Sequence, residues 1–256
     1  GVKADHEEAM KLTVVGSGDA FGSGGRLQTC FHVATAGEEF LIDCGATSLI
    51  GMQRLGLDPQ RVSSIFISHL HGDHFSGLVW WMIHSHHVTR RTQPLTITGP
   101  AGIEERVVTA AEALFPGSAK VERRYELRFI EYTQGESIEV GPVRVTPYEV
   151  RHPSGAPPYA LRIETGGKIV SFSGDTEWVD SLITAANGAD LFIAECFGFN
   201  EPRGYHMTWR EIEKHLDQLG AKRVMLTHMG TEMLAKCSEV RDPRVLVAED
   251  GMIVDV

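Results

Sequence analysis

The chain of 256 residues has 42% hydrophobic residues, a length and composition sufficient for an ordinary hydrophobic core. Its 24 Lys and Arg are outnumbered by 34 Asp and Glu, and the formal charge of −10 disfavours binding to long nucleic acid. The longest apolar runs have the length of strands, far below the roughly 20 residues that span a bilayer, so a membrane role is not expected. The 4 cysteines form no C-x-x-C pair, which excludes a disulfide framework and a thiolate zinc site.

The chain begins with a polar stretch that does not have the pattern of a secretory leader. Gly1 and the polar residues after it lack the basic and apolar regions of such a leader, which favours a cytoplasmic protein. We expect residues 1–10 to be a polar N-terminal extension and residues 11–256 to form a single domain.

Apolar patterns predict strands and helices that alternate along the chain. The first half is predicted to contain a strand at 11–18, a hairpin at 30–45, a helix at 47–55, a strand ending at 68, a helix at 75–87, a strand at 95–99 and a helix at 102–114. The second half is predicted to contain strands at 126–132, 137–140, 143–150, 159–165 and 168–174, a helix at 176–186, a strand at 190–195, a helix at 209–220, a strand at 222–228 and strands within 244–256. This order favours two sheets with helices outside them.

Two motifs do not carry the chemistry that they suggest. GSGDAFG (16–22) resembles a dinucleotide-binding fingerprint, but its third glycine comes one residue late and the chain continues as a loop. HSHH (84–87) lies late in a predicted helix, where adjacent positions face different directions. Surface histidines explain it better than a metal site, although His84 is placed where it could face a pocket.

SHLHGDH (68–74) has the residues of a metal site. His69 and His71 follow a strand, and in extended backbone a spacing of two places both imidazoles on one side. Asp73 and His74 come after a glycine, at the start of a helix, and can face a second cation. Imidazole and carboxylate together favour Zn²⁺, with Mn²⁺ or Fe²⁺ as alternatives.

More ligands must come from distant segments. Three candidates each follow an apolar strand, as His69 does: His152, Asp175 and His228. We predict that His69, His71 and His152 hold one metal ion, that Asp73, His74 and His228 hold the other, and that Asp175 lies between them. Such a pair of open sites leaves room for a bridging water.

This set resembles the metallo-β-lactamase superfamily, whose pattern H-x-H-x-D-H followed by His, Asp and His is met in order. The resemblance covers the chain from Leu12 to its end. It implies an α/β fold, a four-layer αββα sandwich of two mixed β-sheets flanked by helices, with a dinuclear metal centre at its edge. Asp43, in LIDCG (41–45), is expected to support the site or the structure, because a buried carboxylate needs hydrogen-bond partners.

GYHMT (204–208) resembles the H-x-T segment of the ribonuclease Z-like branch, in which a histidine that is not a ligand helps the leaving group depart. His206 fits that position. ADLFIAECF (189–197) resembles the strand of this branch that ends in H-E-A-T, with Ala194 in place of the histidine and Glu195 retained. Glu195 is placed to hydrogen-bond His206 and set its tautomer. A plain surface role for His206 and a buried structural role for Glu195 stay open.

The resemblance leaves the substrate open among several classes. Members that process transfer RNA carry a long arm between the third ligand motif and the bridging aspartate, and here that segment supplies only two strands and a turn. We therefore expect a phosphodiesterase for small or cyclic phosphodiesters, in which a metal-bridging hydroxide attacks, Asp73 orients it or accepts its proton, and His206 is the general acid. A lactonase or thioesterase is the alternative; a transfer-RNA 3′-processing endonuclease and a noncatalytic metal-binding module are disfavoured. A homodimer is compatible with the family.

Loops at 22–29 and 154–158 are expected to wall the pocket. Phe21, Trp80 and Phe197 are expected to pack in the structure, and only Arg26 to face a ligand.

Overall fold

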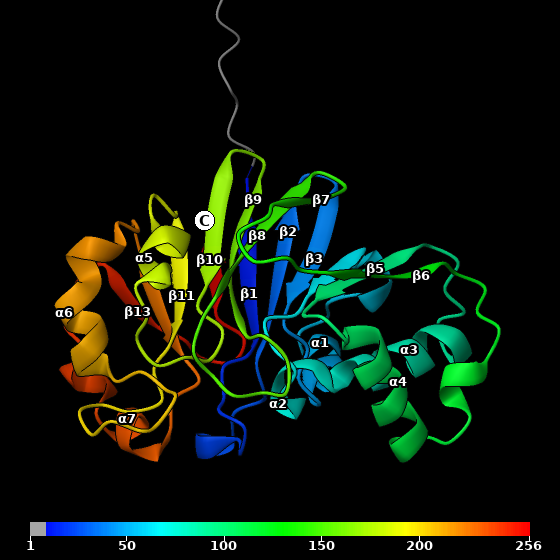
Figure 1. Cartoon of the computed structure of the whole chain (residues 1–256), viewed down its shortest axis with the longest axis horizontal. Helices are drawn as coiled ribbons and strands as arrows, with labels where there is room; N and C mark the ends of the chain where they lie inside the picture. Colours follow the sequence, from blue (N-terminus) through cyan, green and yellow to red (C-terminus); the bar gives the residue numbers. More distant parts are fainter. Residues whose placement is uncertain (1–8) are drawn as a thin grey trace, which may run out of the picture.

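Two mixed β-sheets stand face to face in the computed structural model, which describes residues 9–256 (Figure 1). In spatial order the first sheet consists of β14 (Ile253–Asp255), β1 (Lys11–Gly16), β2 (Cys30–Thr35), β3 (Glu38–Ile42), β4 (Ser64–Phe66), β5 (Leu95–Gly99) and β6 (Leu127–Glu131). The second consists of β13 (Val245–Val247), β12 (Val224–Thr227), β11 (Leu191–Glu195), β10 (Lys168–Phe172), β9 (Tyr159–Thr165), β8 (Val143–Glu149) and β7 (Ile138–Val140).

The core follows from the alternation of side chains along the strands. In β1, Leu12 lies between the two sheets, whereas Val15 packs on the outer side of its sheet. In β11, Leu191 lies between the sheets and Phe192 packs on the opposite side. Each sheet is therefore buried on both faces, and its outer face needs a cover of helices.

Helices supply that cover on both sides of the sandwich (Figure 1). The first sheet is covered by α1 (Ser48–Arg54), α3 (Gly77–His87) and α4 (Ile103–Leu114), and the second by α5 (Ser181–Ala186), α6 (Trp209–Leu219) and α7 (Thr231–Ala235). The start of α6 is fixed by a capping box between Thr208 and Glu211. The predicted four-layer αββα architecture is confirmed.

Strand direction brings several chain segments to one edge of the second sheet. Strands β10, β11 and β12 pair in parallel, and β9 is antiparallel to both β8 and β10. Strands β8, β10, β11 and β12 therefore run the same way and end at the same edge. In the first sheet β3 and β4 are parallel, so that the residues after these two strands are also neighbours.

Several element bounds differ from those predicted. Packed structure begins at Met10, which is buried in the core, one residue before the expected start of the domain at residue 11. Residues 1–8 of that extension lie outside the described residues. The helix predicted at 176–186 is limited to α5, because Thr176 instead bonds to Glu195 and to the backbone of Arg151.

The helical region predicted to begin at 75 begins earlier. A short helix, α2 (Gly72–Phe75), precedes α3 and contains part of the histidine-rich motif. None of the helices found among residues 9–256 has both the length and the apolar character needed to cross a membrane.

Candidate metal centre

The histidine-rich motif begins where β4 ends. His71 is extended, with φ −81° and ψ 147°, and stands directly before α2. Asp73 lies in the first turn of that helix, followed by His74, which is fully buried. The change from extended backbone to helix at Gly72 thus divides the motif into a pair of histidines and an Asp-His pair.

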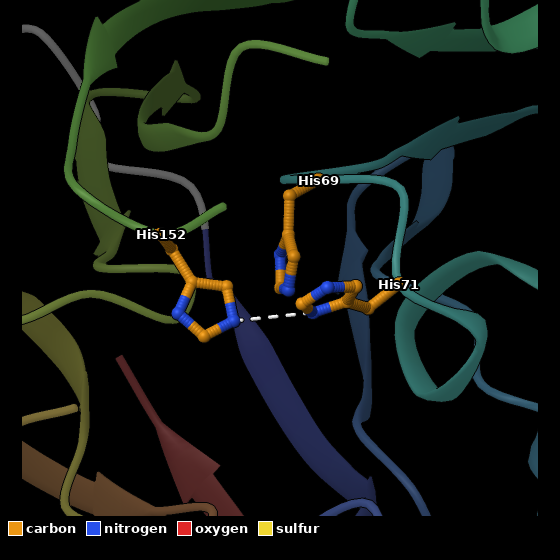
Figure 2. Close-up of side chains that lie close together, drawn as sticks. All are labelled: His69, His71 and His152. Carbon is orange, nitrogen blue, oxygen red and sulfur yellow. Dashed lines mark hydrogen bonds between the residues drawn. The ribbon is translucent and has the colours of Figure 1, made fainter. Parts of the chain in front are cut away.

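Three histidines form the first group of possible ligands. His69, His71 and His152 each offer a ring nitrogen, and these atoms lie within 4.8 Å of one another. His152 Nε2 is 3.1 Å from His71 Nδ1. Figure 2 shows the three rings pointing toward one another, two of them from the segment before α2 and the third from the loop after β8.

A second group of possible ligands lies beside the first. It consists of Asp73, His74, Asp175 and His228, whose ligand atoms also lie within 4.8 Å of one another. Asp73 Oδ2 is 3.1 Å from His74 Nε2 and 3.2 Å from His228 Nε2. The structure thus brings together all seven residues that the sequence singled out, in the two predicted sets.

Asp175 stands where the two groups meet. Its Oδ2 is 3.0 Å from His74 Nε2 and 3.3 Å from His228 Nε2 in the second group. The same oxygen is 3.5 Å from His69 Nε2 and 3.8 Å from His152 Nε2 in the first. This is the intermediate position expected of it.

Hydrogen bonds on the far side of the rings set the histidine tautomers. Asp43 is buried and accepts hydrogen bonds from His74 Nδ1, at 2.6 Å, and from the backbone and hydroxyl of Ser68. The Ser68 hydroxyl in turn accepts from His69 Nδ1 at 2.9 Å. Both imidazoles therefore keep a proton on Nδ1, so that Nε2 is the atom each can offer as a lone pair to a cation, as metal-ligating histidines do.

A backbone carbonyl fixes the tautomer of His152, which lies after the end of β8. His152 Nδ1 donates to the carbonyl oxygen of Tyr205 at 2.8 Å. Tyr205 has a φ of 65°, in the left-handed region that few residues other than glycine adopt. Sequence reasoning missed this contact, since a backbone carbonyl leaves no signal in the residue types.

Burial and the carboxylates pull the imidazole pKa values in opposite directions. Burial lowers the pKa of His152 to about 4, although Asp175 lies near. Burial also opposes protonation of His228, but Asp175 and the hydrogen bond to Asp73 outweigh it and raise the pKa of His228 to about 9. The second group therefore stabilises positive charge, which a cation would supply.

Unpaired buried atoms show that the residues fit metal ions. His69 Nε2 and Asp175 Oδ1 are buried and have no hydrogen-bond partner among residues 9–256. Such an unmet atom costs about 1–3 kcal/mol, a cost that a bound cation removes. Imidazole nitrogens mixed with carboxylate oxygens are suitable donors for divalent metal ions.

His206 lies beside the two groups without belonging to either set of predicted ligands. One of its ring nitrogens lies within 4.8 Å of ligand atoms of both His152 and Asp175. Its Nδ1 donates to Glu195 Oε1 at 2.7 Å, and Glu195 is fully buried at the end of β11. Burial lowers the pKa of His206, but this hydrogen bond and the charge of Glu195 outweigh burial and raise it.

The other residues singled out from the sequence differ from one another in exposure and in contacts. Phe21 is 88% exposed and does not pack in the core, contrary to expectation. Arg26 donates to Ser17 and to the carbonyl of Ala248, which ties its loop to the chain end. Trp80 contacts Phe115 edge to face, as a packing residue. The residues of HSHH form no metal-ligand group in the described part of the chain.

Comparison with known proteins identifies the family. Residues 10–250 match the family model described as anti-Pycsar protein Apyc1. The chain belongs to the Apyc1 family. This family lies within the metallo-β-lactamase superfamily, on its ribonuclease Z-like side, as the sequence indicated.

Relatives support that placement of this Apyc1-family chain. It is 30% identical to ribonuclease Z of Methanothermobacter thermautotrophicus, over 96% of this chain and 97% of the relative. That alignment runs over 298 positions, so the relative has segments that this chain of 256 residues lacks. The protein is a metal-dependent hydrolase.

Solved structures show the same fold. The metallo-β-lactamase fold protein YhfI from Bacillus subtilis has a TM-score of 0.79 and 22% identity, with 97% of this chain and 100% of that chain covered. A diphosphatase from the PhnP family has a TM-score of 0.76 and 19% identity, with 96% and 98% covered.

Proposed function

We propose that this protein is a dinuclear zinc phosphodiesterase that hydrolyses small or cyclic phosphodiesters with His206 as the general acid. One observation carries the proposal: a histidine outside the seven predicted ligands stands beside them, with one nitrogen hydrogen-bonded to a buried carboxylate. A metal site that only binds ions has no need of such a residue. A hydrolase that must expel an alkoxide does.

The seven clustered residues would hold the two cations. The first would bind to His69, His71 and His152, the second to Asp73, His74 and His228, and Asp175 would contact both. When bound, the cations supply an activated water at neutral pH and neutralise the charge of the phosphoryl oxygens. Zinc is the ion that this donor set favours, and Mn²⁺ or Fe²⁺ are the alternatives.

The chain's own residues handle the two protons of the reaction. Hydrolysis adds water across one P–O bond, so one proton leaves the attacking water and another must reach the departing oxygen. Asp73 would orient the water or accept its proton, a role supported by the position of its Oδ2 beside His74 and His228 in the second group. His206 holds its Nδ1 proton against Glu195 and can give the Nε2 proton to the leaving oxygen.

The architecture favours a small substrate. The segment between His152 and Asp175 is taken up by β9, a turn and β10, without an inserted arm. The formal charge of −10 adds a general repulsion of polyanions. Both features disfavour transfer RNA, even though relatives are named ribonuclease Z.

Leaving-group dependence tests this proposal. The zinc-loaded protein is assayed with a cyclic phosphodiester, whose leaving group is an alkoxide, and with bis(p-nitrophenyl) phosphate, whose leaving group departs without a proton. His206→Ala is expected to lower kcat/KM on the cyclic diester by about 10²–10⁴-fold and on the aryl diester far less. Bound zinc, measured in parallel, is expected to equal that of the wild type.

Other outcomes would replace the proposal. Turnover of lactones or thioesters that is indifferent to His206, without phosphodiester hydrolysis, would make this a carboxylic ester hydrolase. Efficient cleavage of precursor transfer RNA would remove the size limit. Bound zinc without turnover of any of these substrates would leave a noncatalytic binding module.

A further inference from the structure

Phe197 follows the strand end that supports His206. Cys196 points into the core behind the second sheet, whereas Phe197, the next residue, is partly exposed. Its ring lies face to face with the His206 imidazole, with 5.0 Å between the ring centroids and 29° between the planes. The sequence pattern suggested a packing role for Phe197, and the structure places the ring on the proposed proton donor.

The same short segment also holds the edge of His206. Glu195 Oε1 accepts the His206 Nδ1 hydrogen bond, and its other oxygen accepts from the backbone N–H of Phe197 at 3.2 Å. The backbone N–H of Thr176 donates to Glu195 as well, at 3.1 Å. Glu195 thus has a fixed orientation, and residues 195–197 contact His206 both at its edge and on its face.

A hydrogen bond at Nδ1 does not by itself fix the plane of an imidazole, because the ring can rock about that bond. Stacking resists such rocking. His206 is stacked on Phe197 and on His228, whose centroid is 5.6 Å away at an angle of 21°. A rotation of His206 would drive its edge into these rings, so they define where Nε2 points.

Gly230 leaves the space that the Phe197 ring occupies. A Cβ at Gly230 would lie 3.0 Å from Phe197 Cε2 and 3.1 Å from Cζ, closer than side chains normally approach. Gly230 has φ −78° and ψ 176°, which any residue adopts. The carbonyl oxygen of Phe197 lies 3.0 Å from the same Cβ position, so the close approach of Phe197 by both its ring and its backbone, and not the φ and ψ of Gly230, requires glycine here. The backbone N–H of Gly230 also donates to the carbonyl of Phe197 at 3.0 Å.

We propose that Phe197 is a positioning residue, which holds the plane of the His206 imidazole so that Nε2 faces the leaving group, and that Gly230 provides the room for it. This inference rests on the proposed role of His206. Phe197 itself touches neither the water nor the departing oxygen. Its loss costs proton transfer without affecting the metal ligands.

Two phosphodiesters and one spectrum test the proposal. On the cyclic diester, Phe197→Ala is expected to lower kcat about tenfold, less than the loss of the acid itself. On bis(p-nitrophenyl) phosphate the change is expected to be under about twofold, since that leaving group needs no proton. Gly230→Ala, which crowds the ring and the carbonyl oxygen of Phe197 without removing the ring, is expected to show the same selectivity. Phe197→Tyr keeps the stacked ring and is expected to restore the wild-type ratio.

The His206 ring protons give a readout that does not depend on turnover. In the wild type, NMR is expected to show them shifted by the ring current of Phe197, and in Phe197→Ala this shift is expected to vanish. Phe115→Ala is the matched control, because Phe115 is also partly exposed and its ring contacts Trp80, far from His206 in the sequence. It is expected to change neither the shift nor the ratio of the two rates.

Failure of this inference is distinct from failure of the proposed function. Equal losses on both diesters, or unchanged His206 signals in Phe197→Ala, would overturn the positioning role. If the wild type hydrolyses neither diester, the proposed function fails, and the NMR shift alone still decides whether Phe197 holds His206. Melting temperature and zinc content, measured for each variant, separate these effects from misfolding.

Discussion

Asp43→Asn is expected to reverse the proton arrangement of two predicted metal ligands. The wild-type carboxylate accepts from His74 Nδ1 directly and from His69 Nδ1 through the Ser68 hydroxyl, so both rings carry their proton away from the site. An amide NH₂ in place of Oδ2 donates instead. The Ser68 hydroxyl must then donate to His69, and both rings must move their proton to Nε2, where a metal ion needs a lone pair.

The expected loss of zinc affinity depends on how many histidine ligands change their tautomer. Loss of one such supporting contact costs about 10–100-fold in metal affinity, and Asp43 supports one ligand in each group, so we expect a loss of at least about 10²-fold. The free energy of unfolding of Asp43→Asn is expected to fall by only about 1–2 kcal/mol, because the remaining side-chain oxygen still accepts a hydrogen bond from the backbone N–H of Ser68. Asn also tolerates the φ of 59° at this position.

Competition with a chelating dye measures the zinc affinity, and ¹⁵N NMR reports the tautomers. Asp190→Asn is the matched control, since Asp190 also accepts a backbone N–H, from Ile169 at 2.8 Å, at the opposite end of β10. It is expected to bind zinc as the wild type does. Wild-type zinc affinity in Asp43→Asn, with both rings still protonated at Nδ1, would refute the reasoning.

Two further predictions concern the metal ions and the close packing around Asp73. Removal of the metal with a chelator is expected to abolish turnover and to lower the melting temperature by about 5–10 °C, because bound cations stabilise only the folded state. Calorimetry before and after zinc is returned measures the change. An unchanged melting temperature would contradict this prediction. Gly45→Ala is expected to lower the free energy of unfolding by about 1–3 kcal/mol and to weaken zinc binding, because its Cβ would overlap the Asp73 carbonyl and lie 2.6 Å from Gln28 Cβ. Denaturant unfolding and zinc stoichiometry test it, and wild-type values of both would show that the turn can yield.

The predicted ligands could be recognised in the sequence because most of them stand directly after a strand. His152, Asp175 and His228 follow β8, β10 and β12, which run in one direction in the second sheet, so their meeting at one edge is a consequence of strand order. His69 follows β4 of the first sheet and reaches the same site from the other side of the sandwich. His206 and Glu195 were found differently, from the resemblance of GYHMT and ADLFIAECF to segments of the ribonuclease Z-like branch. Side chains whose type and spacing are specific can be recognised from residue order alone.

Secondary structure was predicted well where local pattern decides it and less well where distant contacts compete. Helix α6 carries its own start signal in Thr208 and Glu211 and begins at the predicted residue. The stretch before α5 has a helical pattern but no helix, because Thr176 is drawn into hydrogen bonds with Glu195 and Arg151. At this position hydrogen bonds to residues distant in the sequence outweigh the local preference for a helix.

Residue type, spacing and position after apolar strands predicted two sheets with helices outside them and the set of seven clustered residues, and the resemblance to the metallo-β-lactamase superfamily added the αββα order and the candidate general acid. The contacts that hold these residues in place became visible in three dimensions: Asp43 and Ser68 behind two histidines, the Tyr205 carbonyl behind His152 and the Phe197 ring against His206. The physical reason is that such contacts join segments far apart in the chain. Some use backbone atoms, and all depend on distances of a few ångströms that residue order does not encode.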